Sequence, residues 1–215
     1  MFFDSTKKLP KGLFKACVIP RPIAWISTVS KSGVDNLAPF SYFNIVADEP
    51  PMVMFSTTEA HVEKGEKDTL RNVEETGEFV VNITSYALKE KMNRTSMNFP
   101  RHTSEFSMVG IEQSPAKIVQ AKLVKAAPVS LECRYHLSVQ LPTSNPEQLI
   151  NRMVIGQVVG IHVCESVLDE EQRIDPARFK PLARLGYHSY TAIHDRFDMP
   201  RPELPPILET MGLND

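Results

Sequence analysis

Residues 131–141 alternate strictly between apolar and polar side chains, and this pattern constrains the fold more than any other feature of the chain. Successive side chains on a strand point to opposite faces, so a period of two predicts a long, half-buried antiparallel strand. Residues 153–164 predict a second long strand. Gly156 and Gly160 lie within it and indicate a bulge or the close approach of another segment.

The rest of the chain predicts short strands and few helices. Further strands are expected at residues 24–29, 36–44, 52–57 and 78–84, and helices at residues 67–76 and 85–93. Pro39 removes a backbone donor, so its strand should be bulged or at an edge. Asp68 or Thr69 can cap the first helix, and Gly77 stands where a C-terminal glycine belongs. This pattern predicts a mainly β fold with a closed or nearly closed barrel.

Loops and a tail account for the remainder. Residues 94–115 are expected to form a long polar loop, of the kind that is usually functional or mobile. Residues 166–181 are expected to end in a short helical turn. We expect one domain over residues 1–195 and a proline-rich, extended tail over residues 196–215.

Composition excludes several classes of protein. The 215 residues, 42% of them hydrophobic, fit one globular domain with a substantial core. A net charge of −2 gives no general attraction to nucleic acid or to an anionic membrane. No stretch approaches the roughly 18 apolar residues of a membrane helix. We therefore expect neither a nucleic acid nor a membrane as a partner. Three scattered cysteines and no apolar signal segment favour a cytoplasmic protein with reduced thiols.

Several common site motifs are absent from the sequence. There is no GxGxxG, no P-loop and no GxSxG, which argues against a Rossmann site, a nucleoside triphosphatase and an α/β-hydrolase. The six histidines lack the spacing of metal ligands, so we expect no metal site.

Residues 20–28 and 36–44 mix strand-forming apolar residues with hydroxyls, an amide and a guanidinium. A core strand does not need so many polar groups, whereas a ligand with a flat apolar ring, a polyhydroxyl tail and a phosphate does. Flavin mononucleotide (FMN) is such a ligand. The polar candidates in or near strands are Arg21, Ser27, Thr28, Ser41, Asn44 and Ser56.

Each of these features also has an ordinary structural explanation. Lys67 and Thr69 would converge on a phosphate at a helix N-terminus, but a capped surface helix has the same residues. Arg21, between two prolines, suits phosphate or ring-edge binding, and would equally suit an exposed loop. The aromatic residues Trp25, Phe40, Tyr42 and Phe43 either pack on a ring or belong to the core.

Eight successive segments resemble, in order, the motifs of flavin reductase-like, FMN-binding split-barrel proteins, a family that includes flavoredoxin. They are residues 20–28, 36–44, 50–56, 67–72, 77–82, 104–106, 127–133 and 184–187. The resemblance implies a mainly β, Greek-key split β-barrel with a few short α-helices. It also implies a homodimer that binds one FMN per subunit near the dimer interface.

The resemblance further implies which residues contact the cofactor. Phosphate and ribityl contacts fall to Arg21, Ser27, Thr28, Ser41, Ser56, Lys67, Asp68 and Thr69, and ring contacts, made partly through the backbone, to Ala24, Trp25, Phe40 and Tyr42. Many relatives carry two glycines after the Arg-Leu pair, whereas this chain has Gly186 and Tyr187. The pocket wall near Tyr187 and Tyr190 is therefore expected to differ.

The expected function is that of a flavoprotein oxidoreductase. NADH, NADPH or another reduced small molecule would deliver a hydride to the flavin, which would pass electrons to a small-molecule acceptor. This chemistry needs no side-chain nucleophile, so no catalytic residue is predicted, although His61 or His102 are candidates to cover the ring or donate a proton. The alternative is a flavin-binding protein without turnover, acting in storage, sensing or electron carriage. A nucleic-acid-binding barrel is disfavoured by the acidic balance, and a pyridoxamine phosphate oxidase by its different motifs.

Overall fold

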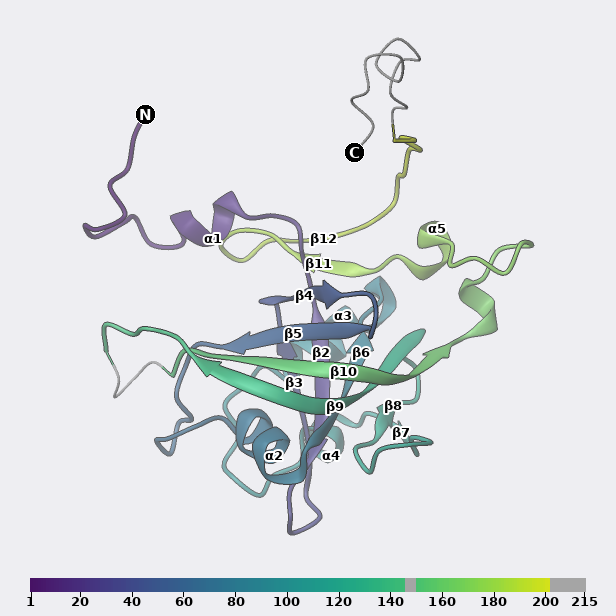
Figure 1. Cartoon of the computed structure of the whole chain (residues 1–215), viewed down its shortest axis with the longest axis horizontal. Helices are drawn as coiled ribbons and strands as arrows, with labels where there is room; N and C mark the ends of the chain where they lie inside the picture. The colour runs from purple at the N-terminus through teal and green to yellow at the C-terminus, as the bar shows by residue number, and fades with distance from the viewer. Residues whose placement is uncertain (146–149, 202–215) are drawn as a thin grey trace, which may run out of the picture.

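The computed structural model describes residues 1–145 and 150–201, and its body is one large antiparallel sheet (Figure 1). The seven strands run in the order β3-β2-β6-β9-β10-β5-β4. They are β2 (Ala24–Val29), β3 (Asp35–Phe40), β4 (Phe43–Ala47), β5 (Met52–Thr57), β6 (Glu78–Ile83), β9 (Val129–Gln140) and β10 (Arg152–Val163). The edge strands β3 and β4 are joined only by Ser41 and Tyr42, so the two edges meet there and the sheet closes into a barrel. The predicted mainly β barrel is confirmed.

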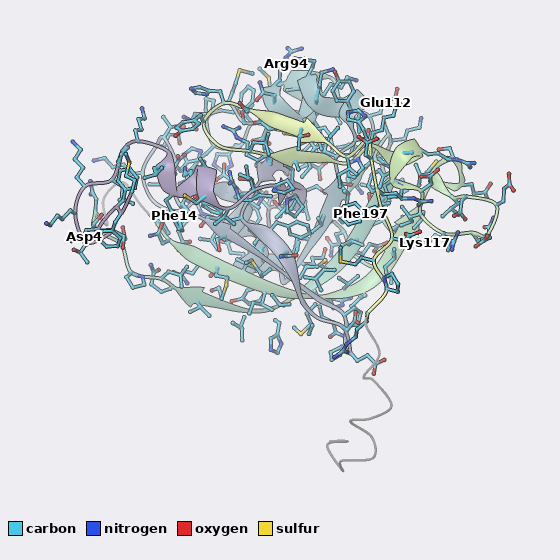
Figure 2. All side chains as sticks on the ribbon, turned by 90° about the horizontal axis from the view of Figure 1, so that it is seen from above. Asp4, Phe14, Arg94, Glu112, Lys117 and Phe197 are labelled. Carbon is cyan, nitrogen blue, oxygen red and sulfur yellow. The ribbon has the colours of Figure 1, made fainter. Side chains whose placement is uncertain are left out.

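A second layer lies over the barrel, at the top of Figure 1. It contains the small sheet of β1 (Arg21–Pro22), β11 (Leu182–Arg184) and β12 (Tyr190–Ala192), with α1 (Leu13–Cys17) beside it. Figure 2, viewed from above, shows α1 with its labelled Phe14 next to this sheet. Gly186 permits the contact, because a Cβ there would lie 2.4 Å from the Cβ of Ala16 and 2.8 Å from its Cα.

The helices are short and lie around the barrel. They are α2 (Asp68–Thr76), α3 (Lys89–Arg94) after the 3₁₀ turn η1 (Tyr86–Leu88), α4 (Glu105–Val109), and α5 (Pro176–Phe179) after the 3₁₀ turn η2 (Glu165–Val167). Gly77 ends α2 with a φ of 75°, as predicted. The predicted cap is wrong: Lys67 is the N-cap residue, and no side chain caps the helix. Asp68 and Thr69 are engaged instead by Arg101 and Asn36.

Two predicted segments differ from the structure. Residues 36–44 form two strands, because the chain turns at Ser41 and Tyr42 and leaves the β2 edge of the sheet for the β5 edge. Pro39 does lie on an edge strand, as predicted. Residues 94–115 contain α4 and the strand β7 (Gln113–Ser114), which pairs with β8 (Leu123–Val124). The helix forms because Phe106 and Val109 are buried in the core.

Two hydrophobic clusters lie on opposite sides of β2 and β3. One fills the barrel and includes the ring of Phe55, whose centroid lies 5.1 Å from that of Phe40 and 5.5 Å from that of Phe79. The other packs under α4 and includes Trp25 and Phe106. The register of β10 shifts beside Gly156, where a Cβ would lie 2.5 Å from the Phe79 ring, so the predicted bulge and close approach are confirmed.

The long strand β9 is confirmed, but its predicted faces are only half right. In its second half the apolar residues Leu137 and Val139 remain 37% and 38% exposed. In its first half Glu132, expected on the polar face, is fully buried. A carboxylate therefore lies where alternation predicts solvent exposure, because the segment containing residues 117–119 folds over it.

Within residues 1–145 and 150–201, no helix is long and apolar enough to cross a membrane. Cys17, Cys133 and Cys164 are free thiols. Residues 196–201 have no regular secondary structure, and the rest of the predicted tail lies outside the described residues.

Candidate functional site

Two adjoining cavities lie beside the junction of β3 and β4. The first, about 220 Å³, lies between β3, the first turn of α2 and residues 95–99. The second, about 520 Å³, lies between the β3–β4 junction, β5, α1 and residues 184–188. Pro39, Phe40, Glu59 and Lys67 line both, so the two cavities form one continuous hollow.

A chain of buried polar groups forms one wall of the first cavity. The Asn36 side-chain amide donates to both carboxylate oxygens of Glu105, at 3.0 and 2.9 Å, and the Leu37 N–H also donates to Glu105, at 2.8 Å. The Thr69 hydroxyl donates to Asn36 Oδ1 at 2.8 Å. Burial raises the pKa of Glu105 to about 7, although the bonds from Leu37 and Asn36 oppose the shift.

Asp68 and His61 also line the first cavity. Arg101 donates to Asp68, and His61 Nε2 lies 3.6 Å from the same carboxylate. Burial lowers the pKa of His61. Asp68, at the start of α2, is thus linked to the loop that contains Arg101. His102, the other candidate histidine, lines neither of the two cavities.

The second cavity is strongly cationic. Its basic lining residues are Lys11, Lys15, Arg21, Lys67 and Arg184, whereas the one carboxylate among its lining residues is that of Glu59. Lys67 Nζ lies 3.6 Å from Glu59. Hydroxyl groups of Ser41, Tyr42, Ser56 and Thr58 add donors to this wall. The cavity is therefore suited to an anion carried on an apolar body.

Arg21 has a structural role in this cavity. Its guanidinium donates to the carbonyls of Lys15, of Val18 at 2.6 Å and of Leu185 at 3.1 Å, and so fastens α1 to the loop after β11. Its Nε is buried and has no hydrogen-bond partner within the described structure. The guanidinium thus contributes charge to the wall and one unused donor.

The hollow brings together most of the predicted site residues. Those that line it are Arg21, Phe40, Ser41, Tyr42, Ser56, Lys67, Asp68 and Thr69. Tyr187 also lines it, as its departure from the family pattern indicated; its φ is 55°, and its ring lies where a Cβ on Gly12 would come within 3.0 Å.

Five predicted contacts lie elsewhere and line neither cavity. Ala24 and Trp25 are fully buried in the two core clusters, and Trp25 Nε1 donates to Thr95 at 2.8 Å. Ser27 is buried and donates to the Lys122 carbonyl at 2.5 Å. Thr28 lies behind Asn36, with their oxygens 3.4 Å apart. Asn44 is exposed on β4, where it accepts from the Ile45 N–H at 2.9 Å.

Sequence reasoning did not select Asn36 or Glu105 as site residues. Each is an ordinary polar residue in its local pattern, and 69 positions separate them. A polar residue that opens a strand and an acidic residue that opens a short helix are weak signals when taken alone. Only the packing of α4 against β3 brings them together.

Comparison with known proteins gives a consistent result. The model of the flavin reductase like domain matches residues 16–190. An uncharacterised protein from Aquifex aeolicus is 38% identical over 87% of this chain and 89% of its own length. The structure of nitrilotriacetate monooxygenase component B from Bacillus cereus matches with a TM-score of 0.84 and 32% identity, covering 93% of this chain and 98% of that one.

Two further structures extend the comparison. The 2-nitrobenzoate 2-nitroreductase of Pseudomonas fluorescens matches with a TM-score of 0.77 and 30% identity, covering 90% of this chain and 91% of that one. A split barrel domain protein from Shewanella frigidimarina, described as a flavin reductase, matches with a TM-score of 0.76 and 18% identity, covering 89% of this chain and 91% of that one. At 18% identity this match supports the fold alone. The expected split barrel is thereby confirmed.

Proposed function

The chain belongs to the flavin reductase-like family, and on that basis we propose that it binds FMN in the hollow formed by the two cavities and acts as an oxidoreductase. The observation that carries the proposal is the composition of this hollow. It combines several cations and hydroxyls with the apolar surfaces of Phe40 and Tyr42. This is the donor set that a phosphate, a ribityl chain and an aromatic ring require.

The residues present fit FMN group by group. Lys67 and the free N–H groups at the start of α2 suit the phosphate. The hydroxyls of Ser41 and Ser56 suit the ribityl chain, and the Arg21 guanidinium adds a positive charge to the wall. Ala24, Trp25, Ser27, Thr28 and Asn44 are left out of this proposal, because they do not line the hollow.

When bound, FMN supplies hydride acceptance and onward electron transfer. The protein's residues would bind and orient it: Lys67 and the start of α2, where the two cavities adjoin, would hold its anionic end, and Phe40 would pack along its apolar part. The segment at α1 and the loop after β11 form one side of the second cavity and would shield part of a bound ligand from water. We propose NADH, NADPH or another reduced small molecule as donor. The names of similar structures, a monooxygenase component and a nitroreductase, support an enzyme that hands electrons to a separate acceptor.

The first test of this proposal is the visible spectrum. Protein purified from cells, or mixed with FMN and desalted, is expected to retain flavin absorption. Oxidation of NADH or NADPH should then be measured with FMN present. Protein that never takes up FMN contradicts the proposed site. Flavin binding without consumption of either nicotinamide cofactor would favour the alternative, a flavin-binding or electron-carrier protein.

We further propose that the protein is a homodimer formed through the outer face of β9, β10 and β5. The register places Leu137, Ile155 and Met54 in one row of this face, and Val139, Met153 and Ser56 in the next outward-facing row. Ser56 also lines the second cavity, so the apolar face adjoins the proposed flavin site. Light scattering after gel filtration is expected to give twice the chain mass, and a strict monomer would exclude this interface.

A further inference from the structure

The polar wall of the first cavity contains a linked set of hydrogen bonds that runs from Glu105 through Asn36 to Thr69. The Asn36 amide nitrogen lies 3.0 and 2.9 Å from the two carboxylate oxygens of Glu105, so one of its N–H groups is shared between them, and Asn36 Oδ1 accepts the hydroxyl proton of Thr69. A threonine hydroxyl has one proton, so Thr69 presents only lone pairs to the cavity in this arrangement. Lone pairs repel a phosphate, which is itself only an acceptor.

The protonation state of Glu105 determines this arrangement. An ionised carboxylate accepts hydrogen bonds only, so it fixes the Asn36 amide with its NH₂ toward α4 and its oxygen toward Thr69. A protonated Glu105 would instead donate its O–H to Asn36 Oδ1, with the amide reversed, while its other oxygen still accepts from the Leu37 N–H. The reversed amide would donate to Thr69 Oγ1 and so free the Thr69 proton for a ligand.

We propose that Glu105 is a positioning residue that acts through Asn36. Its protonation state sets whether the Thr69 hydroxyl offers a proton or a lone pair to the first cavity. Binding of an anionic flavin there is therefore coupled to the uptake of one proton. This inference rests on the proposed function. The step makes and breaks no bond other than those to hydrogen: one proton passes from solvent to the Glu105 carboxylate when the phosphate binds.

The charges around Glu105 favour such coupling. Besides burial, like-charge repulsion from Asp68, at the start of α2, raises the pKa of Glu105, and Asp68 is itself held by Arg101 and Arg71. Glu59, His61 and Lys67 are the other titratable residues that line the cavity. Asp35, on the same strand as Asn36, accepts from Gln113 at 3.0 Å. Burial already raises the pKa of Glu105 to about 7, and a bound phosphate would raise it further by like-charge repulsion. The group therefore gains a proton on binding at neutral and mildly alkaline pH.

The test is FMN affinity as a function of pH, measured by fluorescence titration from about pH 6.5, where the phosphate is mostly a dianion, to about pH 9. For the wild type, Kd is expected to rise by up to about tenfold per pH unit, the limit for one coupled proton. Glu105→Gln mimics the protonated acid, because its amide can donate to Asn36. It should bind with a nearly flat profile and more tightly than the wild type at alkaline pH.

Two further measurements separate positioning from a merely structural role. Calorimetry in buffers of different ionisation enthalpy should show proton uptake by the wild type with FMN, and little with Glu105→Gln. Riboflavin, which lacks the phosphate, should show no Glu105-dependent slope with either protein.

Glu78→Gln is the matched control. Glu78 is 7% exposed, as is Glu105, and it accepts a backbone N–H from Gln120 at 2.6 Å, but it lines neither cavity. Its replacement should leave the pH slope of FMN binding unchanged. A wild-type slope in Glu105→Gln, or a slope lost equally in Glu78→Gln, would overturn the inference alone. Failure of the wild type to bind FMN at any pH would overturn the proposed function and this inference together.

Discussion

Replacing Glu132 with Ala is expected to lower the free energy of unfolding by roughly 3–5 kcal/mol, because it leaves three backbone N–H groups without their acceptor at about 1–3 kcal/mol each. Its fully buried carboxylate accepts the N–H groups of Lys117, Ile118 and Val119 at 2.8, 2.6 and 2.9 Å. It also bonds to His162 Nε2 at 2.5 Å. The substitution would leave these donors without an acceptor and release the segment that covers β9.

Urea denaturation measures this effect, and Glu112→Ala is the control. Glu112 pairs with Lys125 at 2.8 Å, but its side chain is 76% exposed, so its loss should leave the stability almost unchanged. The prediction is contradicted when Glu132→Ala loses no more stability than this control. Glu132→Gln, which keeps one acceptor oxygen, should fall between the two.

Glu132 and Glu105, both buried, should make the free energy of unfolding change in opposite directions as the pH rises. Burial opposes ionisation of Glu132, but bonds from His162, Lys117, Val119 and Ile118 outweigh it and hold its pKa at about 2. Its stabilisation is therefore present above its unfolded pKa of about 4.5 and is lost as the pH falls toward about 2. Glu105 has a raised pKa of about 7. The native state holds its proton longer than the unfolded chain, so its contribution weakens as the pH rises from about 4.5 to about 7.

The position of Glu132 also marks the limit of what alternation can predict. A period of two identifies β9, because side-chain direction follows from strand geometry alone. Which face is buried depends on the segments that cover it, and these come from elsewhere in the chain. The segment containing residues 117–119 covers the polar face of β9 at Glu132, whereas the apolar face at Leu137 and Val139 is not covered within the described structure.

Prediction of the site has the same limit. Motif order brought Arg21, Ser41, Ser56 and Lys67 to one hollow, because these residues lie at strand ends and a helix start that the fold holds in fixed places. Trp25 is not in the hollow, because its ring is packed in the apolar core cluster under α4. The motifs record which segments line a ligand. They do not record which side chain in each segment points toward it.

Replacing Lys67 with Met is expected to weaken FMN binding by roughly 10- to 100-fold, the equivalent of losing one charge-assisted hydrogen bond of about 1.5–3 kcal/mol. Lys67 lines both cavities, and its side chain is 30% exposed. Its ammonium group lies 3.6 Å from Glu59, an exposed partner that can move to solvent when an anion arrives. Methionine keeps the apolar stem, so the melting temperature should change little. Fluorescence titration with FMN and thermal unfolding measure the two effects.

A comparison of FMN with riboflavin separates the effect of the lost lysine charge from an effect on packing. Riboflavin has the same ring and ribityl chain as FMN but no phosphate, so Lys67→Met should change its affinity little. Lys125→Met removes a surface cation that lines neither cavity, and it should leave both affinities unchanged. Equal losses for FMN and riboflavin in Lys67→Met would mean that this lysine acts on the ring or on the shape of the cavity. The phosphate would then have to lie elsewhere in the cationic wall, near Lys11, Lys15 or Arg184.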